Sequence, residues 1–228
     1  MSNLRKDGEL RWVPSYLRRR GKVTKSQKRA LRDYWPQFGL TMEHGESLPF
    51  ESSFKESQPY ALEIGFGTGE HLVEQAGKHP ELNFLGVEVH KPGIGAALNL
   101  IVDAEISNVR VMRGDARLVL EDFLPEVKFQ RIWVLFPDPW PGDSNAHRRL
   151  VQPDLVELMG RRAAAGCLLT ISTDVAEYAN HVDQVMSEAS KWQRVDMPDG
   201  PDRCRTRYEQ RGMDEGRSIH DRFYTYRD

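Results

Sequence analysis

The sequence has few cysteines and no long hydrophobic run, and both absences limit what the protein can be. Its two cysteines, Cys167 and Cys204, lie far apart, and no His or Cys stands at the spacing of a zinc site. This predicts free thiols, no disulfide framework and no metal site, as is typical of proteins in a reducing cytoplasm. No apolar stretch approaches the roughly 20 residues that span a bilayer, and the N-terminus lacks the apolar core of a signal peptide. The sequence therefore predicts a cytoplasmic protein that does not cross a membrane.

The formal net charge is only −2, but the charges are unevenly distributed. Residues 1–32 contain eleven Lys or Arg and two acidic residues, so this segment is about +9 and the remainder about −11. A basic segment attached to an acidic body is typical of a protein that binds a polyanion. With 228 residues, of which 39% are hydrophobic, the chain is long enough to form one sizeable core.

The basic segment contains a signal for a helix. Thr24 and Gln27 stand at capping-box spacing, which predicts a helix from about Lys25 to Tyr34 with Lys and Arg on its outer face. The apolar side chains between positions 31 and 38 favour docking of this helix on the protein. A solvated basic tail is the alternative, because blocks of like charge are usually solvated.

The rest of the chain alternates between strand-like and helix-like runs. Residues 41–59 are rich in Glu, Ser and Pro and are predicted to form a linker between an arm, residues 1–40, and a domain, residues 60–228. Beyond the linker, five apolar runs from "YALEIGFG" to "GCLLTISTD" are separated by helical patterns, which predicts a parallel sheet with helices on both faces. The segments "QRVDMPD" and "DRFYTYRD" are expected to add two closing strands, making seven.

The first predicted strand ends in a glycine loop, "LEIGFGTGE". Gly65, Gly67 and Gly69 follow the acid Glu63 with the spacing G-x-G-x-G, which permits a tight turn and close approach of a ligand to the backbone. A dinucleotide fingerprint would place its third glycine one position later, and an acid before the loop favours a ligand with a cationic portion. The loop by itself is also compatible with a nicotinamide cofactor or with a structural turn.

Two further acids end the next strands. Glu88 lies 19 residues beyond Gly69, where a carboxylate can accept hydrogen bonds from ribose hydroxyls, and Asp115 ends the third strand near the expected adenine position. Together with the loop, these acids favour S-adenosylmethionine, a nucleoside that carries a positive charge. For Asp115, an ordinary turn aspartate is nearly as good an interpretation.

The stretch "WVLFPDPWPG", residues 133–142, places Asp138 between prolines at the end of another strand. In such sheets the ligand lies outside the carboxyl ends of the strands, which would put Asp138 beside the methyl group of the cofactor. Each proline disfavours the helical conformation of the residue before it, so Phe136, Asp138 and Trp140 are expected to be extended. A structural proline-rich loop is the alternative.

At this point the chain resembles the bacterial tRNA (guanine-N7)-methyltransferases, from the arm to the C-terminus. The matching segments are "RGKVTKSQKRALRDYWP", "LEIGFGTGEHLV", "GVEVHKPGIG", "LFPDPW", "STDVAEYA" and "TRYEQRG". The glycine loop is common to many methyltransferases, whereas the combination of "FPDPW" with "TRYEQRG" is much more specific. The resemblance implies a Rossmann-like class I methyltransferase fold and transfer of a methyl group from S-adenosylmethionine to N7 of a tRNA guanine, in this family nucleotide 46 of the variable loop.

The resemblance also implies roles for individual residues. Glu63, Glu88, Asp115 and Asp138 would contact the cofactor together with the glycine loop, and Asp138 would be the catalytic residue. The substrate would be bound by Asp174, Thr206, Arg207, Tyr208 and Glu209, and RNA also by Arg148 and Arg149 in the loop after Trp140.

Two positions depart from the family pattern: Gly142, and His147, which begins a cluster that usually reads Lys-Arg-Arg. A lysine usually stands two residues after the tryptophan, where this chain has Gly142. The departure leaves two other functions open: a methyltransferase of the same fold that acts on another RNA or a small molecule, and a weakly catalytic RNA-binding paralogue. The sequence leaves open whether the protein is a monomer or a homodimer.

Overall fold

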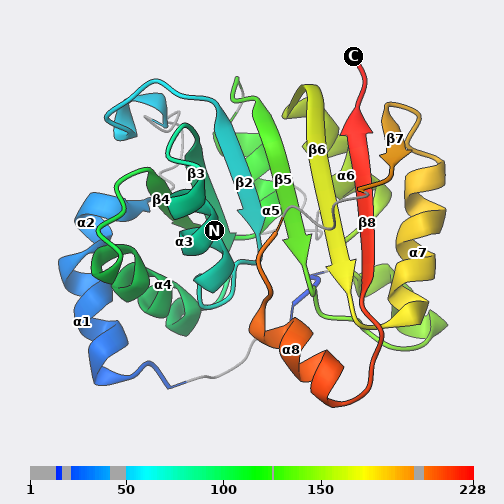
Figure 1. Ribbon diagram of the computed structural model, residues 1–228, viewed down its shortest axis with the longest axis horizontal. Helices are drawn as coiled ribbons and strands as arrows, with labels where there is room; N and C mark the ends of the chain where they lie inside the picture. Colours follow the sequence, from blue (N-terminus) through cyan, green and yellow to red (C-terminus); the bar gives the residue numbers. More distant parts are fainter. Residues whose placement is uncertain (1–13, 17–21, 42–49, 125, 198–202) are drawn as a thin grey trace, which may run out of the picture.

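The computed structural model describes residues 14–16, 22–41, 50–124, 126–197 and 203–228. They form one central sheet with helices on both sides (Figure 1). The helices are α1 (Lys25–Asp33), α2 (Trp35–Phe38), α3 (Glu70–Lys78), α4 (Lys91–Asp103), α5 (Ala116–Leu118), α6 (Pro153–Arg161), α7 (Ala176–Ser187) and α8 (Arg207–Asp214), with short turns η1 (Glu51–Ser53), η2 (Val119–Phe123) and η3 (Asp143–Arg148).

The strands are β1 (Gly39–Leu40), β2 (Tyr60–Ile64), β3 (Asn83–Glu88), β4 (Val109–Arg113), β5 (Phe129–Leu135), β6 (Ala163–Thr173), β7 (Trp192–Val195) and β8 (His220–Tyr226). Their order in the sheet is β1-β4-β3-β2-β5-β6-β8-β7. Strands β1 to β6 run parallel, and β8 pairs antiparallel with both β6 and β7. The predicted parallel sheet and its two closing strands are confirmed.

The sheet has eight strands rather than the predicted seven. The additional strand, β1, follows the basic helix and pairs with β4 through Gly39 and Leu40. Two residues are too few to show an alternating apolar pattern in the sequence. The strand is recognisable only from its pairing with β4 in the structure. Its partner residues are Val111 and Met112, near the end of β4.

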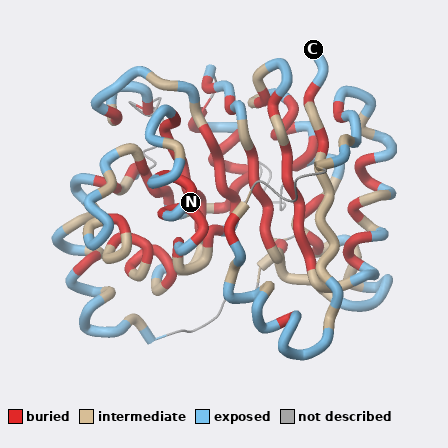
Figure 2. Tube along the Cα trace, viewed as in Figure 1, coloured by how far each residue is buried: buried red, intermediate tan, exposed pale blue. Residues whose placement is uncertain are grey.

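The two faces of the sheet carry separate hydrophobic clusters because neighbouring residues of a strand point to opposite faces. In β5, Ile132 and Val134 belong to the cluster under α5, α6 and α7, whereas Trp133 and Leu135 belong to the cluster under α1, α3 and α4. Figure 2 shows strands β2 to β6 buried along most of their length and the outer surfaces of the helices exposed. The predicted covering of both faces by helices is confirmed.

The basic helix is docked, as the apolar residues of the arm predicted. Thr24 and Gln27 form the expected capping box of α1, and the helix packs against α4. The approach is close, because a Cβ added to Gly95 of α4 would lie 2.8 Å from Cβ of Gln27. The described part of the arm is therefore part of the folded body.

The segment predicted as a linker contains part of the core. Phe50 and Phe54 are buried and pack edge-on against each other and tilted against Tyr60, with ring centroids 4.9–5.9 Å apart. Residues 42–49 of this segment lie outside the described residues. The two phenylalanines are isolated among polar residues, so no periodic pattern marks them as buried.

Candidate active site

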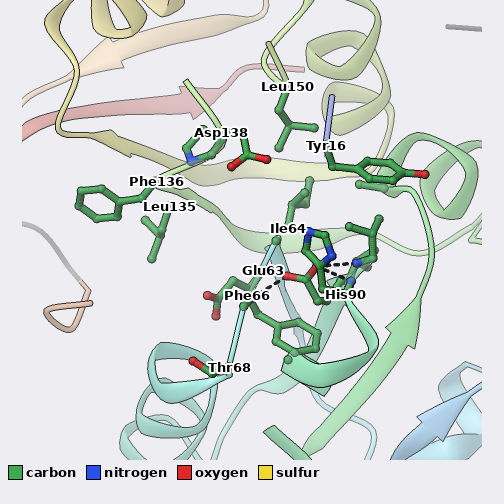
Figure 3. A pocket seen from close by; sticks show the side chains of 18 of the residues that line it. Tyr16, Glu63, Ile64, Phe66, Thr68, His90, Leu135, Phe136, Asp138 and Leu150 are labelled. Carbon is green, nitrogen blue, oxygen red and sulfur yellow. Dashed lines mark hydrogen bonds between the residues drawn. The ribbon is translucent and has the colours of Figure 1, made fainter. Parts of the chain in front are cut away.

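A cavity of about 390 Å³ lies at the carboxyl ends of β2, β3, β4 and β5 (Figure 3). This volume falls within the ~300–1,000 Å³ typical of small-molecule sites, and strand ends are where parallel sheets bind ligands. The predicted residues Glu63, Gly65, Gly67, Glu88, Asp115 and Asp138 all line it. The fold thus brings together residues that are separated by up to 75 positions in the chain.

The glycine loop shapes one wall of the cavity. Gly65 and Gly67 have φ of 76° and 60°, and a Cβ added at either position would meet no atom within 4 Å. The backbone is therefore open to a ligand where these side chains would otherwise stand. Gly69 differs, because it does not line the cavity and a Cβ there would lie 2.5 Å from Cβ of Ala97. Gly69 allows α3 to pack on α4, and its contact with the cofactor stays a prediction.

Glu63 is buried in the strand before the loop, and its carboxylate already has a partner. Oε2 lies 2.9 Å from Nδ1 of His71, the second residue of α3, which is buried as well. The His71 ring also meets Trp133 edge-on, with centroids 5.4 Å apart. Because His71 also lines the cavity, the acid and the imidazole form a pair at its base.

Glu88 closes β3 with its carboxylate fixed by backbone N–H groups. Oε1 accepts hydrogen bonds from Val89 at 2.6 Å and His90 at 2.8 Å, and Oε2 accepts one from Gly67 at 2.9 Å. Each carboxylate oxygen can accept about two hydrogen bonds, so Oε2 keeps one position for a ligand hydroxyl. The acid therefore joins the glycine loop to the next strand.

Asp115 follows β4 and has the local role that the alternative interpretation predicted. Its Oδ1 accepts a hydrogen bond from the backbone N–H of Arg117 at 2.9 Å, so it caps α5. It also lines the cavity. The two interpretations of this residue are therefore compatible.

The loop after β5 carries Asp138 into the cavity, but its backbone differs from the prediction. Phe136 and Trp140, expected to be extended, have φ of 49° and 42°, in the left-handed region. The expectation was wrong because it considered only each residue and the proline after it. Left-handed backbone costs a non-glycine residue about 1–2 kcal/mol, so contacts from elsewhere must hold this loop.

Several of those contacts converge on Trp140. Its Nε1–H donates to the carbonyl of Ser15 at 2.7 Å, and the guanidinium of Arg148 lies 3.9 Å from the centroid of its ring. Arg149, which is buried, donates to the carbonyls of Pro139 and Trp140 at 3.3 and 3.4 Å. Arg149 therefore stabilises the loop through two of its carbonyl groups. Contacts of Arg148 or Arg149 with RNA stay predictions.

Gly142, which stands where the family usually has a lysine, also has an unusual backbone conformation. Gly142 has φ 82° and ψ 149°, close to a region that only glycine populates. Its N–H donates to Glu177 Oε1 at 3.1 Å, and the same carboxylate binds Arg149. A lysine at this position is incompatible with this loop conformation. The loop therefore adopts this conformation only because glycine replaces the lysine.

The predicted substrate segment reaches the cavity from α8, which lies beside the strand ends (Figure 1). Thr206, Arg207 and Tyr208 line the cavity, and Arg207 contacts Thr68 and Glu70 of the opposite wall. Asp174 and Glu209 are not among the lining residues. The structure therefore places three of these five residues at the cavity and two beside it.

The lining residues that were not predicted as site residues include Ser15, Tyr16 and His71. Tyr16 meets His90 edge-on, with centroids 6.5 Å apart (Figure 3). In the sequence, Ser15 and Tyr16 lie in the basic arm and carry no local signal of a small-molecule site. Only the return of the arm to the strand ends places them there.

Comparison with known proteins agrees with this geometry. A family model described as "Putative methyltransferase" matches residues 57–222. The tRNA (guanine-N(7)-)-methyltransferase of Alkalilimnicola ehrlichii is 40% identical over 222 residues, which cover 95% of this chain and 93% of the relative. The enzyme of the same name from Shewanella amazonensis is 41% identical over 217 residues, 93% and 91% of the two chains.

Solved structures support the fold alone. The 16S rRNA methyltransferase KamB superposes with a TM-score of 0.54 at 15% identity, covering 95% of this chain and 99% of that one. On the strength of the near full-length relatives and the family model, this chain belongs to the tRNA (guanine-N7)-methyltransferase family.

Proposed function

We propose that this protein transfers a methyl group from S-adenosylmethionine to N7 of a guanine in tRNA. The observation that carries the proposal is the convergence of Glu63, Glu88, Asp115 and Asp138 on one cavity beside an open glycine loop. The names of the relatives point to the same reaction. A tRNA substrate is also consistent with the cytoplasmic location that the sequence predicts.

The residues present fit the proposed methyl donor. The four predicted acids at the cavity suit a ligand with cationic groups, and the space beside Gly65 and Gly67 suits close contact with the backbone. Glu88 would hold the ribose with the accepting position left on Oε2, and Glu63, kept in place by His71, would face the cationic end. When bound, S-adenosylmethionine supplies an electrophilic methyl group on a positively charged sulfur.

Asp138 is proposed to act by electrostatics and orientation. Guanine N7 has a lone pair and carries no proton, so its reaction needs alignment more than it needs a base. Methylation leaves the guanine ring positively charged. A fixed carboxylate beside the ring would stabilise that charge as it develops and would accept hydrogen bonds from the donors of guanine.

The docked basic helix is proposed to bind the RNA backbone. The major groove of A-form RNA is deep and narrow, so N7 is accessible mainly in a splayed-out or irregularly paired base. The side chains of Lys25, Lys28 and Arg29 on α1 are exposed and can grip phosphates away from the cavity. Arg148, whose guanidinium lies 3.9 Å from the centroid of the Trp140 ring, offers a further cation in the loop after β5.

One assay tests the proposal directly. The protein is incubated with methyl-labelled S-adenosylmethionine and unmodified bulk tRNA, and the RNA is then digested to nucleosides. We expect the label in 7-methylguanosine. We expect Asp138→Ala to lower kcat about 10²–10³-fold, the size of effect seen when one preorganised electrostatic contact is removed.

The outcomes separate the three functions left open by the sequence. Label in another nucleoside would favour a different RNA target, and no label with retained cofactor binding would favour a weakly catalytic paralogue. Wild-type turnover by Asp138→Ala would overturn the role given to that residue. Asp143→Ala, in the exposed part of the same loop, is the matched control and should retain activity.

A further inference from the structure

Two arginines flank α8 in the sequence, and each binds a carboxylate that the family resemblance assigns to the substrate. Arg203 binds Glu209, and Arg217 binds Asp174. We infer that both arginines are positioning residues: they hold α8 at the cavity, and Glu209 and Asp174 serve the reaction through this helix rather than by touching guanine. The inference rests on the proposed function and concerns the substrate side of the same site.

Arg203 anchors the start of the helix. Its side chain is 1% exposed, and it donates to Asp221 of β8 at 2.9–3.2 Å as well as to Glu209. Asp221 also accepts a hydrogen bond from Ser172 at the end of β6. A buried guanidinium is tolerated only with such partners, so Arg203 ties α8 to two strands of the sheet.

The carboxylate of Glu209 is therefore already bound by groups of the protein itself. Besides binding Arg203, it completes the capping box of α8, because its N–H donates to Oγ1 of Thr206 at 3.1 Å and its Oε2 accepts from the N–H of Thr206 at 3.4 Å. Its side chain is 12% exposed. The carboxylate thus fixes the first turn of α8, which is the turn that presents Thr206, Arg207 and Tyr208 to the cavity.

Arg217 anchors the other end of the helix. Its Nε lies 2.8 Å from Oδ2 of Asp174, the residue after β6, and its backbone N–H donates to the carbonyl of Gly212 at 2.8 Å. A Cβ added to Gly212 would lie 3.0 Å from the same Oδ2, so the helix passes directly over Asp174. Asp174 is therefore covered by α8 and bound by Arg217.

The position of α8 depends on these ion pairs and hydrogen bonds, because few apolar side chains of the helix pack against the protein. Within α8, which is described in full, only Gly212 is buried. Hydrophobic packing therefore contributes little to its position. Removing one anchor should let the cavity-lining first turn shift, which would lower turnover on tRNA while leaving the cofactor wall intact.

A double-mutant cycle between Arg217 and Asp174 tests the inference. Arg217 is suitable because its side chain is 38% exposed, so Arg217→Ala is expected to fold. The four proteins are wild type, Arg217→Ala, Asp174→Ala and the double variant. For each, one measures kcat and KM on tRNA, the Kd for S-adenosylmethionine and the thermal unfolding curve.

We expect Arg217→Ala, Asp174→Ala and the double variant to show the same loss in kcat/KM, about tenfold, as for one charge-assisted hydrogen bond. The Kd for S-adenosylmethionine should stay within about twofold, and Arg217→Lys should recover part of the activity. Arg211→Ala is the control on the same helix: Arg211 is 72% exposed and pairs with Glu215, which Arg217 also binds, so this variant removes a cation beside Glu215 and keeps the contact with Asp174.

Two results would overturn the inference: Arg217→Ala as active as Arg211→Ala, or a loss from Asp174→Ala that persists in full when Arg217 is already removed. The second result would mean that Asp174 contacts the substrate directly. The wild-type protein is assayed for 7-methylguanosine in parallel. If it forms none, the proposed function fails, whereas a failure confined to the cycle concerns the inference alone.

Discussion

At the residue scale, the conformation of the loop that carries Asp138 depends on partners far away in the chain. Phe136 and Trp140 precede prolines and still have positive φ. The strain is offset by Arg149, which binds the loop carbonyls, and by the carbonyl of Ser15, which binds Trp140. The local rule for residues before proline could not include these contacts. Tertiary contacts therefore decide the direction in which Asp138 is presented.

The cysteines behave as their scarcity predicted, since both are free and buried. Burial of the thiol, with a smaller contribution from neighbouring Glu74, raises the pKa of Cys204 to about 11 from an ordinary value of 9.0. A pKa two units higher means about a hundredfold less thiolate near pH 8, and the thiolate is the reactive form. Cys204 should therefore resist alkylation at that pH.

This resistance can be measured with iodoacetamide at pH 8, following the Cys204 peptide by mass spectrometry. We expect labelling of the folded protein about a hundredfold slower than of the denatured protein at the same pH. Because the folded pKa is raised, the rate should keep rising as the pH increases beyond 9. Equal rates in the folded and denatured protein would contradict the assignment.

At the scale of elements, capping signals in the sequence were accurate guides. The capping box at Thr24 and Gln27 predicted α1 within one residue of its observed end, and it forms as expected. The strands β2 to β6 are equally evident in the sequence, because each is a buried apolar run bounded by turn residues. The two-residue strand β1 and the buried Phe50 and Phe54 had no such pattern, so packing alone determined them.

The basic face of α1 supports a prediction on RNA binding. In the triple variant Lys25→Ala, Lys28→Ala and Arg29→Ala, three exposed cations are lost from a helix that packs through its other face. We expect weaker tRNA binding and a salt dependence that is shallower by up to about three phosphate contacts, each contributing ~0.7–0.9 to the slope. The measurement is tRNA affinity at several salt concentrations.

The matched control removes three cations from the opposite edge of the sheet, at Lys191, Arg194 and Arg227. This control should keep the wild-type slope and bind S-adenosylmethionine normally. If both triple variants reduce the slope equally, the basic helix has no special role in RNA binding.

At the scale of the whole molecule, the parallel sheet creates the site by placing the carboxyl ends of four strands together. The four acids Glu63, Glu88, Asp115 and Asp138 come from four separate segments. Each lies at or just beyond the carboxyl end of a strand. Among the described residues, no helix is long and apolar enough to cross a membrane. The arm contributes Ser15 and Tyr16 to the cavity, so the arm and the sheet line it together.

Ligand binding should therefore stabilise the whole protein. At 100 times its Kd, S-adenosylmethionine is expected to add about 2.7 kcal/mol to the free energy of unfolding. For a chain of this size that corresponds to a rise in Tm of roughly 5–10 °C. Glu88→Gln should reduce the rise at the same concentration, because it removes the carboxylate that is proposed to hold the ribose.

Glu81→Gln provides the control, since Glu81 is exposed at the turn before β3 and does not line the cavity. Thermal unfolding with and without cofactor compares the three proteins. If Glu88→Gln gains as much stability as wild type and Glu81→Gln, Glu88 does not bind the cofactor.

The sequence by itself determined the alternation of helices with the strands from β2 onward, the glycine loop, the acids at the strand ends and the family. These features are local: they depend on periodicity, caps and short motifs, which are written in consecutive residues. Only the tertiary structure decided which of those residues share a cavity, that Ser15 and Tyr16 return to it, that Gly142 stands in a glycine-only conformation, and that Glu209 and Asp174 are bound by arginines. Those outcomes depend on contacts between distant segments, and no local pattern encodes them.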